Sequence, residues 1–475
     1  MRQWLFPIVL ILIAAFASWQ AVLTDTALAE SVDMETSNST EAPLATPLLS
    51  VRRTPTFLQE PLLVDNLADS LGELVNTFPS QSCLAVSIDG EQVFGHNPTL
   101  PLVPASAQKI LTAYGAYEIL GADYTFETTV VTDAPIVDGI LDGDLYLVGG
   151  GDPLLATADY VDRYEQQPHF RTGIEQLADQ VVAAGVTEIN GGIIGDEERY
   201  DDVRYIPEWP ERFTNVSQNQ TGPLSALTVN DGFVNFPSDS TAPSLATATT
   251  APATFAAAFF DDLLEDRGVI IRGASGEAPA PANARVIGSV ISDPVSVAAN
   301  QMLDISDNMA GEMLLKEIGF VASRSGTSQG GAIALENLLL EDGFSVAETD
   351  VADGSGLASE NRVTCQLLLE VLDATAGTPL HDGLAVAGES GTLIERFVGT
   401  PAAGRVEAKT GRLNEVGALA GTAQANDGTE IIFAWLANTT DLYPVEEMEA
   451  AQNAIALELV GFPEGPSIEA FAPIQ

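Results

Sequence analysis

Apolar and polar residues change their spacing several times along the chain, and each change predicts a different element. An amphipathic stretch at residues 62–75 predicts a helix. Two strand-like runs at 83–88 and 92–95, joined by the turn Asp89-Gly90, predict a hairpin. Apolar positions at helical spacing after Ser106 then predict a buried helix that begins near this serine.

From residue 126 to 291, short strand-like pieces alternate with turns rich in Gly, Asp and Pro, which predicts a mainly β region. Helical stretches near 173–185 and 253–267 interrupt it. Helical spacing then returns, and the chain closes with strands and a last helix. We expect these later helices near 295, at 308–320, 331–342 and 444–460, and the strands at 405–409, 416–424 and 429–436. The whole pattern predicts an α+β protein of several domains.

The amino terminus has the composition of an export signal. A basic residue precedes an almost wholly apolar stretch at 5–17, and Ala27-Leu28-Ala29 offers a small-x-small cleavage site. We expect a signal peptide at residues 1–29; the alternative is an uncleaved membrane anchor. Residues 30–60, rich in Ser, Thr, Pro and Glu, predict a disordered linker. Export to the periplasm or the extracellular space disfavours ATP- or NAD-dependent chemistry.

The charge balance narrows the choice of partners. Lys and Arg together number 19 and Asp and Glu number 67, so the net charge is −48. A polyanion of this kind repels nucleic acid and anionic membrane surfaces, so neither is expected as a partner. We interpret the acidity as a solubilising surface whose charges salt would screen, with a cationic partner as the alternative. The apolar fraction of 46% is enough for a large core.

Neither the cysteines nor the histidines show the spacing of a metal site. Cys83 and Cys365 lie far apart, and we favour two buried thiols over a disulfide, which export would also permit. His96, His169 and His381 are scattered along the chain. No metal site is therefore expected from these residues.

The chain contains only three lysines, Lys109, Lys316 and Lys409, so lysine is not a general surface residue here. Lys109 follows Ser106 by three positions, and such residues share one face of a helix. Serine needs a base to act as a nucleophile, and a lysine whose pKa is lowered by burial and nearby positive charge can serve. By itself this Ser-x-x-Lys pair is a weak signal.

Two further short motifs follow. Ser306-Asp307-Asn308 opens an apolar helix, and its ordinary interpretation is a helix cap. Lys409-Thr410-Gly411 ends a strand-like run, which indicates either a strand entering a turn or a substrate-binding edge strand. Together with Ser106 and Lys109 they form, in order, the set found in class A β-lactamases and penicillin-binding proteins. Two of the three lysines fall on motif positions, which makes a chance match hard to credit.

On these motifs the chain resembles the class C low-molecular-mass penicillin-binding proteins, the S13 family of D-alanyl-D-alanine carboxypeptidases and endopeptidases. The resemblance spans roughly residues 62 to 462. Ser106 and Ser306 lie 200 positions apart, which resembles this family rather than a compact β-lactamase. Other matching segments are 102–106, 143–153, 353–357 with Asn361-Arg362, and 391–393.

The resemblance implies a β-lactamase/transpeptidase-like serine-hydrolase domain, with helices around an antiparallel sheet, built from residues 61–125 and 292–475. Residues 126–291 would be a large, mainly β insertion forming one or two extra domains. The implied partners are peptidoglycan stem peptides and β-lactams, without a cofactor. A membrane would be involved only through an uncleaved signal anchor.

The catalytic roles of the family fall on five residues of this chain. Ser106 would attack the carbonyl between two D-alanines and become acylated, and Lys109 would take its proton. Ser306 would pass a proton to the leaving D-alanine, and Asn308 would orient Lys109 and the substrate amide. Lys409 would supply positive charge to the substrate carboxylate.

Substrate binding is implied for further positions. Thr410 would help to hold the carboxylate, Gly411 permits the close approach of another backbone, and the N–H groups of Ser106 and Arg412 would form the oxyanion hole. A small Ser or Thr is commoner where Arg412 stands, which leaves the substrate preference open. Asp152 has two interpretations: a contact from the insertion to the peptide stem, or only a turn that follows glycines.

Three residues after the second motif, Asp353, Ser355 and Arg362, are expected to brace a loop near the cleft. Two functional alternatives stay open. A β-lactamase or esterase would use the same residues with fast deacylation, although the long insertion argues against it. A non-catalytic wall-binding sensor is disfavoured because the nucleophile, the base and Lys409 are all intact.

Overall fold

The computed structural model describes residues 56–163, 168–213, 220–236, 246–439 and 445–463. Residues 63–475 form one compact unit, and residues 1–62 form another, of which only the start of helix α2 (Thr56–Leu74) is described. The predicted signal peptide lies outside the described residues, as does the linker up to residue 55. Within the described ranges, no helix combines the length and apolarity that crossing a bilayer requires.

A six-stranded antiparallel sheet carries the motifs at the two ends of the chain. Its strand order is β16-β17-β18-β19-β1-β2, so the first strand of the chain lies beside the last. The predicted hairpin and the predicted closing strands are confirmed. The bounds are β1 Gln81–Ile88, β2 Glu91–His96, β16 Ala385–Val386, β17 Val406–Leu413, β18 Val416–Gln424 and β19 Glu430–Asn438.

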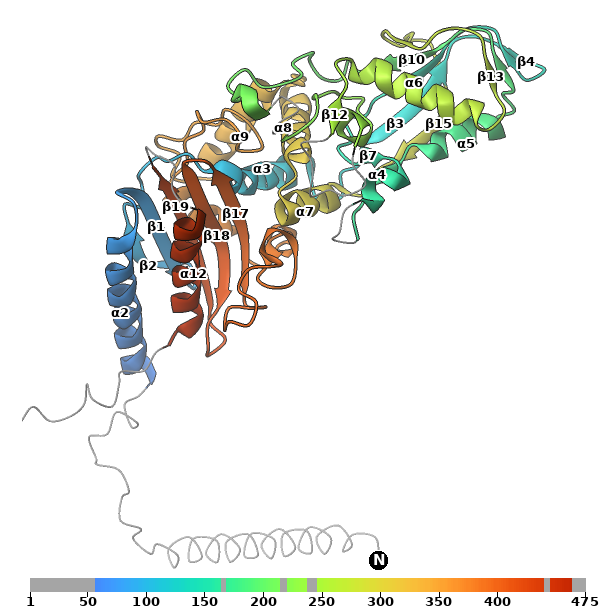
Figure 1. Cartoon of the computed structure of the whole chain (residues 1–475). Helices are drawn as coiled ribbons and strands as arrows, with labels where there is room; N and C mark the ends of the chain where they lie inside the picture. Colours follow the sequence, from blue (N-terminus) through green and yellow to red (C-terminus); the bar gives the residue numbers. More distant parts are fainter. Residues whose placement is uncertain (1–55, 164–167, 214–219, 237–245, 440–444, 464–475) are drawn as a thin grey trace, which may run out of the picture. The chain divides into compact units, whose positions relative to one another are not determined.

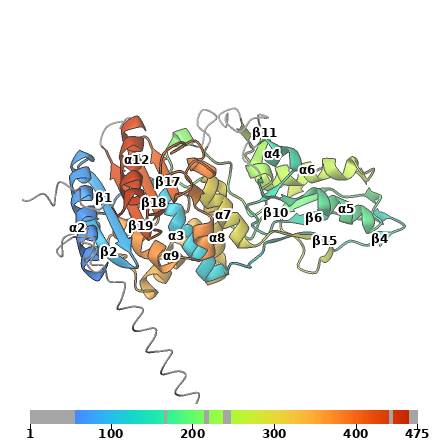
Figure 2. The ribbon, with the colours of Figure 1, turned by 90° about the horizontal axis from the view of Figure 1, so that it is seen from below.

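Side chains alternate between the two faces of this sheet, as the period of two in a strand requires. One face carries small residues such as Ala85, Ala420 and Ala434, which share a core with α3, α8 and α10. The opposite face carries larger residues such as Leu84 and Trp435, which share a core with α2 and α12. The sheet therefore lies between two helical layers (Figure 1 and Figure 2). Small side chains on the first face let α3, which holds Lys109, approach the sheet closely.

Most of the expected helices are confirmed, with shifted ends. Helix α2 begins at Thr56, six residues before the predicted start, and so takes up the last residues of the predicted linker. The bounds of the others around the sheet are α3 Gln108–Gly115, α7 Val295–Ile305, α8 Asn308–Ser323, α9 Ser328–Glu341, α10 Cys365–Ala374, α11 Pro379–Asp382 and α12 Val445–Gly461.

Between α3 and α7 the chain forms a mixed five-stranded sheet, in the order β14-β10-β6-β3-β15, together with smaller sheets. Helices α5 and α6 share a core with it that includes Leu147, Leu177 and Phe260. The bounds are β3 Glu127–Thr132, β4 Ile136–Val137, β5 Ile140–Leu141, β6 Leu145–Val148, β7 Leu155–Ala156, α4 Ala158–Asp162, β8 Thr172–Gly173, α5 Glu175–Ala183, β9 Glu188–Ile189, β10 Ile193–Asp196, β11 Phe233–Asn235, β12 Thr247–Ala248, α6 Pro252–Glu265, β13 Ile270–Ile271, β14 Gly276–Glu277 and β15 Arg285–Ile291.

One stretch of this region packs against the elements that carry the second motif. Tyr200, Trp209 and Leu224 share a core with Met309 and Met313 of α8. Residues 200–213 and 220–226 are therefore part of the wall of the motif region rather than of the five-stranded sheet. The division of the chain into a catalytic part and a separate insertion at 126–291 stays a prediction.

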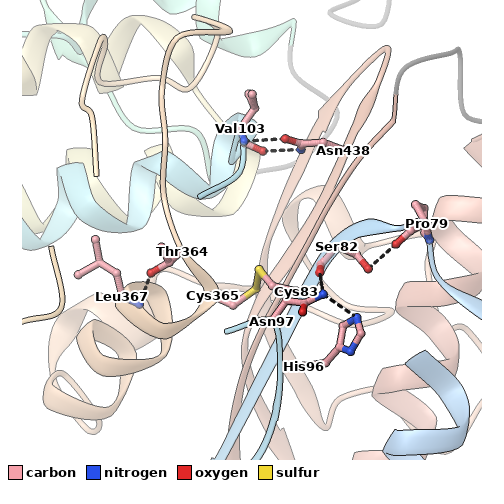
Figure 3. Close-up of a disulfide and its surroundings, with 10 residues drawn as sticks. All are labelled: Pro79, Ser82, Cys83, His96, Asn97, Val103, Thr364, Cys365, Leu367 and Asn438. Carbon is pink, nitrogen blue, oxygen red and sulfur yellow. Dashed lines mark hydrogen bonds between the residues drawn. A yellow bond between two sulfur atoms is a disulfide. The ribbon is translucent and has the colours of Figure 1, made fainter. Parts of the chain in front are cut away.

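The expectation of two free thiols is wrong, because Cys83 and Cys365 form a disulfide (Figure 3). Cys83 lies on β1 and Cys365 in the first turn of α10, which Thr364 caps by accepting a hydrogen bond from the N–H of Leu367 at 3.0 Å. Packing of α10 against the small residues of β1 brings the two sulfurs together over 282 positions of sequence. Sequence spacing alone gives no sign of such a contact.

Replacing both cysteines with alanine should destabilise the protein by about 2–5 kcal/mol, because the crosslink restricts the unfolded chain over a long loop. The measurement is urea unfolding of the double variant Cys83→Ala and Cys365→Ala beside the native protein. Native protein treated with reductant is the control and should fall to the level of the variant. A loss below about 0.5 kcal/mol, the size of an ordinary surface substitution, would contradict the expectation.

Candidate active site

Ser106 lies in a single 3₁₀ turn, Ala105–Ala107, that leads directly into α3. The preceding Ala105 has a φ of 47°, a left-handed conformation that is unfavourable for a residue with a Cβ. The backbone just before it is anchored to β19: Val103 N donates to Asn438 Oδ1 at 2.8 Å, and Asn438 Nδ2 donates back to the Val103 carbonyl at 3.0 Å (Figure 3). The fold therefore holds a half-buried serine at a helix start, on a strained but well-supported turn.

Lys109 lies one helical turn further on, with its amine directed at Ser106. Its Nζ lies 3.1 Å from Ser106 Oγ and donates to Asn308 Oδ1 at 2.8 Å and to the Ser355 carbonyl at 2.6 Å. A neutral amine has two N–H donors and one lone pair. Asn308 and Ser355 accept from the two donors, so the lone pair is left to accept the proton of Ser106. The pairing predicted from the spacing of Ser106 and Lys109 is present.

The Lys109 side chain is fully buried, and burial lowers its pKa from 10.5 to about 8. The nearby carboxyl groups of Asp353, Asp307 and Glu312 act in the opposite direction and limit the drop. With a pKa of about 8, roughly a tenth of the molecules hold a neutral Lys109 at pH 7. The site thus supplies a usable base at neutral pH.

Acylation by a penicillin should accelerate with rising pH, pass half of its maximum near pH 8 and level off about one unit higher, where Lys109 is almost wholly neutral. Below pH 8 the second-order rate constant should rise roughly tenfold per pH unit, because the neutral fraction does so. Stopped-flow acylation between pH 6 and 9 measures this. A flat profile in the native protein would contradict the assignment of Lys109 as base.

The Ser306-Asp307-Asn308 motif is the junction of α7 and α8, and its expected interpretation as a helix cap is confirmed at Asp307. Ser306 ends α7 in a left-handed conformation, with φ 64°, and Asp307 caps α8 by accepting from Ala310 N at 3.1 Å. Because Asp307 provides the cap, Asn308 is free to face Lys109. Its other side-chain atom, Nδ2, donates to the Gln220 carbonyl at 2.8 Å, so the amide is held from two sides.

Lys409-Thr410-Gly411 lies within β17, not at its end as predicted, since the strand continues to Leu413 opposite Val416. On the outer side, β16 pairs only with Glu407 and Ala408, so among the described strands the edge from Lys409 onward is open. Gly411 faces the nucleophile turn: a Cβ there would come within 2.7 Å of the Pro104 carbonyl oxygen. The expected close approach of two backbones at this glycine is therefore observed.

The Lys409 side chain is fully buried, and burial together with the charge of Lys109 lowers its pKa well below the usual value, while Asp304 opposes this. Its Nζ donates to the Thr410 carbonyl at 2.9 Å. The Thr410 hydroxyl donates to Thr392 Oγ1 at 2.8 Å. The two lysines of the motifs thus act on each other electrostatically beside the open strand edge, and each favours the neutral form of the other.

The two remaining predicted residues lie outside this cluster. The Arg412 side chain is more than half exposed, 4.0 Å from Glu449, so only its backbone belongs to the edge. Asp152 is buried and accepts from Leu154 N at 2.8 Å, which closes its own turn. Burial raises the pKa of Asp152 to about 6. Among the described contacts none joins Asp152 to the motif residues, so its role toward a substrate stays a prediction.

The loop after Asp353 is braced as expected. The Asp353 carboxylate accepts from Gly356 N and Ala358 N, both at 2.7 Å, and from Trp209 Nε1 at 2.7 Å. Gly356, with φ +84°, packs so tightly that a Cβ there would meet the Ala105 carbonyl oxygen at 1.9 Å. The loop therefore supports the strained turn before Ser106 and aims the Ser355 carbonyl at Lys109. Arg362 donates locally to the carbonyls of Ser359 and Asn361, both at 2.7 Å.

Glu312 was not expected in the site. It lies one turn after Asn308 on α8, fully buried, and its Oε1 accepts from Gly354 N at 3.0 Å and Ser355 N at 2.8 Å. Burial and the charge of Asp353 raise the pKa of Glu312 to about 8. The hydrogen bonds from Ser355 and the charge of Lys109 act in the opposite direction and limit the rise. Glu312 therefore positions the loop whose carbonyl accepts from Lys109. An acidic residue four positions after Asn308, and so on the same face of the helix, was the signal in the sequence.

Comparison with known proteins finds a family and several relatives that this chain resembles along most of its length. The family model described as the D-Ala-D-Ala carboxypeptidase 3 (S13) family matches residues 67–243 and 235–459. A D-alanyl-D-alanine carboxypeptidase of Actinomadura sp. is 29% identical over 454 residues, which cover 79% of this chain and 81% of that protein.

Two solved structures show the same fold. Penicillin binding protein 4 of Haemophilus influenzae matches with a TM-score of 0.69 at 22% identity, over 81% of this chain and 99% of that chain. A predatory peptidoglycan endopeptidase of Bdellovibrio bacteriovorus matches with a TM-score of 0.50 at 17% identity, over 78% of this chain and 91% of that chain. The predicted α+β, multi-domain fold is therefore confirmed.

Proposed function

Because the chain belongs to the D-Ala-D-Ala carboxypeptidase S13 family, we propose that it is a serine D,D-peptidase of peptidoglycan. It releases the terminal D-alanine of stem peptides, cuts the cross-bridges that end on a D-alanine, or does both. The observation that supports this most directly is the Lys109 amine, buried and 3.1 Å from Ser106 Oγ. Segments far apart in sequence surround this pair and hold the amine beside the hydroxyl, as a nucleophile and its base require.

Acylation begins when neutral Lys109 accepts the Ser106 proton and Oγ attacks the carbonyl carbon of the scissile amide. The N–H groups of Ser106 and Arg412 stabilise the oxyanion of the tetrahedral intermediate. When the intermediate collapses, the C–N bond breaks and the leaving amine takes a proton, which Ser306 relays from Lys109. A water molecule then hydrolyses the ester and restores Ser106.

The open edge of β17 binds the substrate. An extended peptide can add to such an edge as a further strand, with backbone hydrogen bonds to Thr410 and Arg412. Its terminal carboxylate lies at Lys409 and Thr410, where the negative charge of the carboxylate favours the charged form of the buried Lys409 amine. The same edge accepts a β-lactam, whose ring carbonyl takes the place of the scissile amide, and penicillin binding is named for the Haemophilus influenzae structure.

Export fits both the chemistry and the covalent structure. Peptidoglycan lies outside the cytoplasm, and the Cys83–Cys365 disulfide is of a kind that persists in oxidising compartments. We therefore assign the protein to the periplasm or the extracellular space.

Labelling with a fluorescent penicillin, followed by peptide mapping by mass spectrometry, tests the proposal. We expect one stable adduct, on Ser106, and release of D-alanine from stem pentapeptides or cleavage of purified cross-linked muropeptides. Folded protein without a Ser106 adduct would overturn it. Turnover of penicillin at many cycles per second would indicate a β-lactamase instead.

A further inference from the structure

A segment between β10 and β11 packs against the elements that surround the base, although it carries none of the three motifs. We name its residues 200–213 and 220–226 the β10–β11 connection. Within it, Trp209 is buried in a core that this connection shares with α8. The proposed mechanism uses no atom of the connection, yet two of its hydrogen bonds end on residues that hold Lys109 in place.

The first of these hydrogen bonds comes from the indole of Trp209, whose Nε1 donates to Asp353 Oδ2 at 2.7 Å. The Asp353 carboxylate is fully buried, and its other donors belong to residues 355–361 of its own loop, at 2.7 to 3.4 Å. Among the described contacts, Trp209 is therefore the one donor that joins this carboxylate to a distant part of the chain. Each donor matters, because a buried carboxylate that loses one keeps more of its negative charge uncompensated.

The second hydrogen bond lies on the other side of the base. Asn308 Nδ2 donates to the Gln220 carbonyl at 2.8 Å. Asn308 Oδ1 and the Ser355 carbonyl are the two groups that accept from Lys109 Nζ, at 2.8 and 2.6 Å. The β10–β11 connection therefore stands behind both acceptors of the amine: directly behind Asn308, and through Asp353 behind Ser355.

The loop that carries Asp353 is also held at other points. Glu312 on α8 accepts from two of its backbone N–H groups, at 2.8 and 3.0 Å, and Thr112 on α3 donates to the Gly354 carbonyl at 2.7 Å. These contacts fix the backbone of the loop but do not touch the Asp353 carboxylate. Loss of the Trp209 N–H should therefore leave the loop folded while it changes the setting of this carboxylate.

The Asp353 carboxylate also acts on the charge of the base. Four ionisable groups face the Lys109 amine from three elements: Asp353 on the loop, Asp307 and Glu312 on α8, and Lys409 on β17. Burial lowers the pKa of Lys109, and Asp353 is the carboxyl group that opposes this most strongly. Because the Trp209 N–H compensates part of the Asp353 charge, it weakens the attraction of Asp353 for the ammonium form and so favours the neutral amine.

We propose that Trp209 is a positioning residue for the base. Its N–H holds Asp353, and through this carboxylate it fixes the Ser355 carbonyl, which accepts from Lys109. The lone pair of the neutral amine is thereby left facing Ser106. The inference rests on the proposed D,D-peptidase function, because it concerns the acylation step of that reaction. Trp209 contacts no substrate in this role, so the affinity for substrate should not depend on its N–H.

The variant Trp209→Phe tests this, because it keeps an aromatic ring in the core and removes the N–H. Stopped-flow acylation by penicillin at several concentrations, from pH 6 to 10, gives the dissociation constant, the limiting rate and the pH midpoint. We expect the limiting rate to fall by roughly tenfold and the dissociation constant to stay within about twofold. The midpoint should move up by roughly half a pH unit, since the less compensated Asp353 favours the charged amine.

The matched control is Trp435→Phe. Trp435 is also fully buried, but its Nε1 has no hydrogen-bond partner among the described residues. Rates are expressed per molecule that finally labels, so a loss of folded protein does not count as a loss of rate. The control should therefore keep the native limiting rate, dissociation constant and midpoint.

A second substitution, Trp209→benzothienylalanine, replaces the indole N–H with sulfur and keeps the shape of the side chain. It should reproduce the slower acylation and the shifted midpoint even if the phenylalanine variant folds poorly. A native rate and midpoint in this protein would overturn the proposal, and so would a lower melting temperature as its only change. Equal effects in Trp435→Phe would also overturn it. Absence of a Ser106 adduct in the native protein would instead overturn the proposed function.

Discussion

Replacing Ser106 with alanine should abolish the covalent penicillin adduct and lower the rate of D-alanine release by about 10⁴–10⁶-fold. Lys109, Asn308 and the oxyanion donors remain in place, but no atom is left that can form the ester. Residual activity would come from water and from the electrostatics of the site. The expected measurement is loss of fluorescent labelling together with kcat/KM on a stem pentapeptide.

The fold should survive this change, because Ser106 is only half-buried and its turn is held by backbone contacts. A matched control is Ser359→Ala, an exposed serine in the loop that follows Asp353. It should keep labelling and activity within about twofold, as surface substitutions usually do. If the Ser106→Ala protein still formed an adduct, mass mapping would identify another nucleophile and the mechanism would be wrong.

Replacing Lys109 with methionine should slow acylation by about 10²–10⁴-fold, the usual contribution of a general base. Methionine fills a similar volume, so the buried space stays occupied while the amine is lost. The variant should still label slowly, and its rate should lose the rise with pH that the native protein shows around pH 8. Acylation rates measured over pH 6–9 separate these outcomes.

Lys316 offers the matched control, because it is equally buried but forms an ion pair with Asp201 rather than a bond to Ser106. Lys316→Met should lower the melting temperature, since it leaves Asp201 unpaired. Its acylation rate per folded molecule should stay within about threefold of the native rate. If both variants lost acylation equally, the loss would follow from replacing any buried lysine. That result would contradict the specific role of Lys109 as the base.

The chemistry of the site was largely predictable because it depends on short motifs. The three-residue spacing of Ser106 and Lys109 fixes their shared helix face whatever the rest of the chain does. Asn308 was found through its motif, and the ambiguity with helix capping disappears because the neighbouring Asp307 provides the cap. The roles of all these residues, Ser306, Lys409 and the oxyanion donors included, stay predictions until variants are measured.

What the sequence did not predict depends on contacts between distant segments. The end of β17 was misplaced because Gly411 resembles a strand breaker, while pairing with β18 carries the strand on to Leu413. The cysteines were judged by their separation, although the packing of α10 on β1 decides their distance.

All three lysines of the chain are fully buried. The described surface therefore presents no side-chain ammonium group, and amine-reactive dyes, crosslinkers and resins have nothing on it to modify. Trypsin would have to cut the folded protein at arginines alone. A lysine introduced at an exposed position would in turn be a unique chemical handle, through which a fluorophore or a surface could be attached at one known point without competing reactions at Lys109 or Lys409.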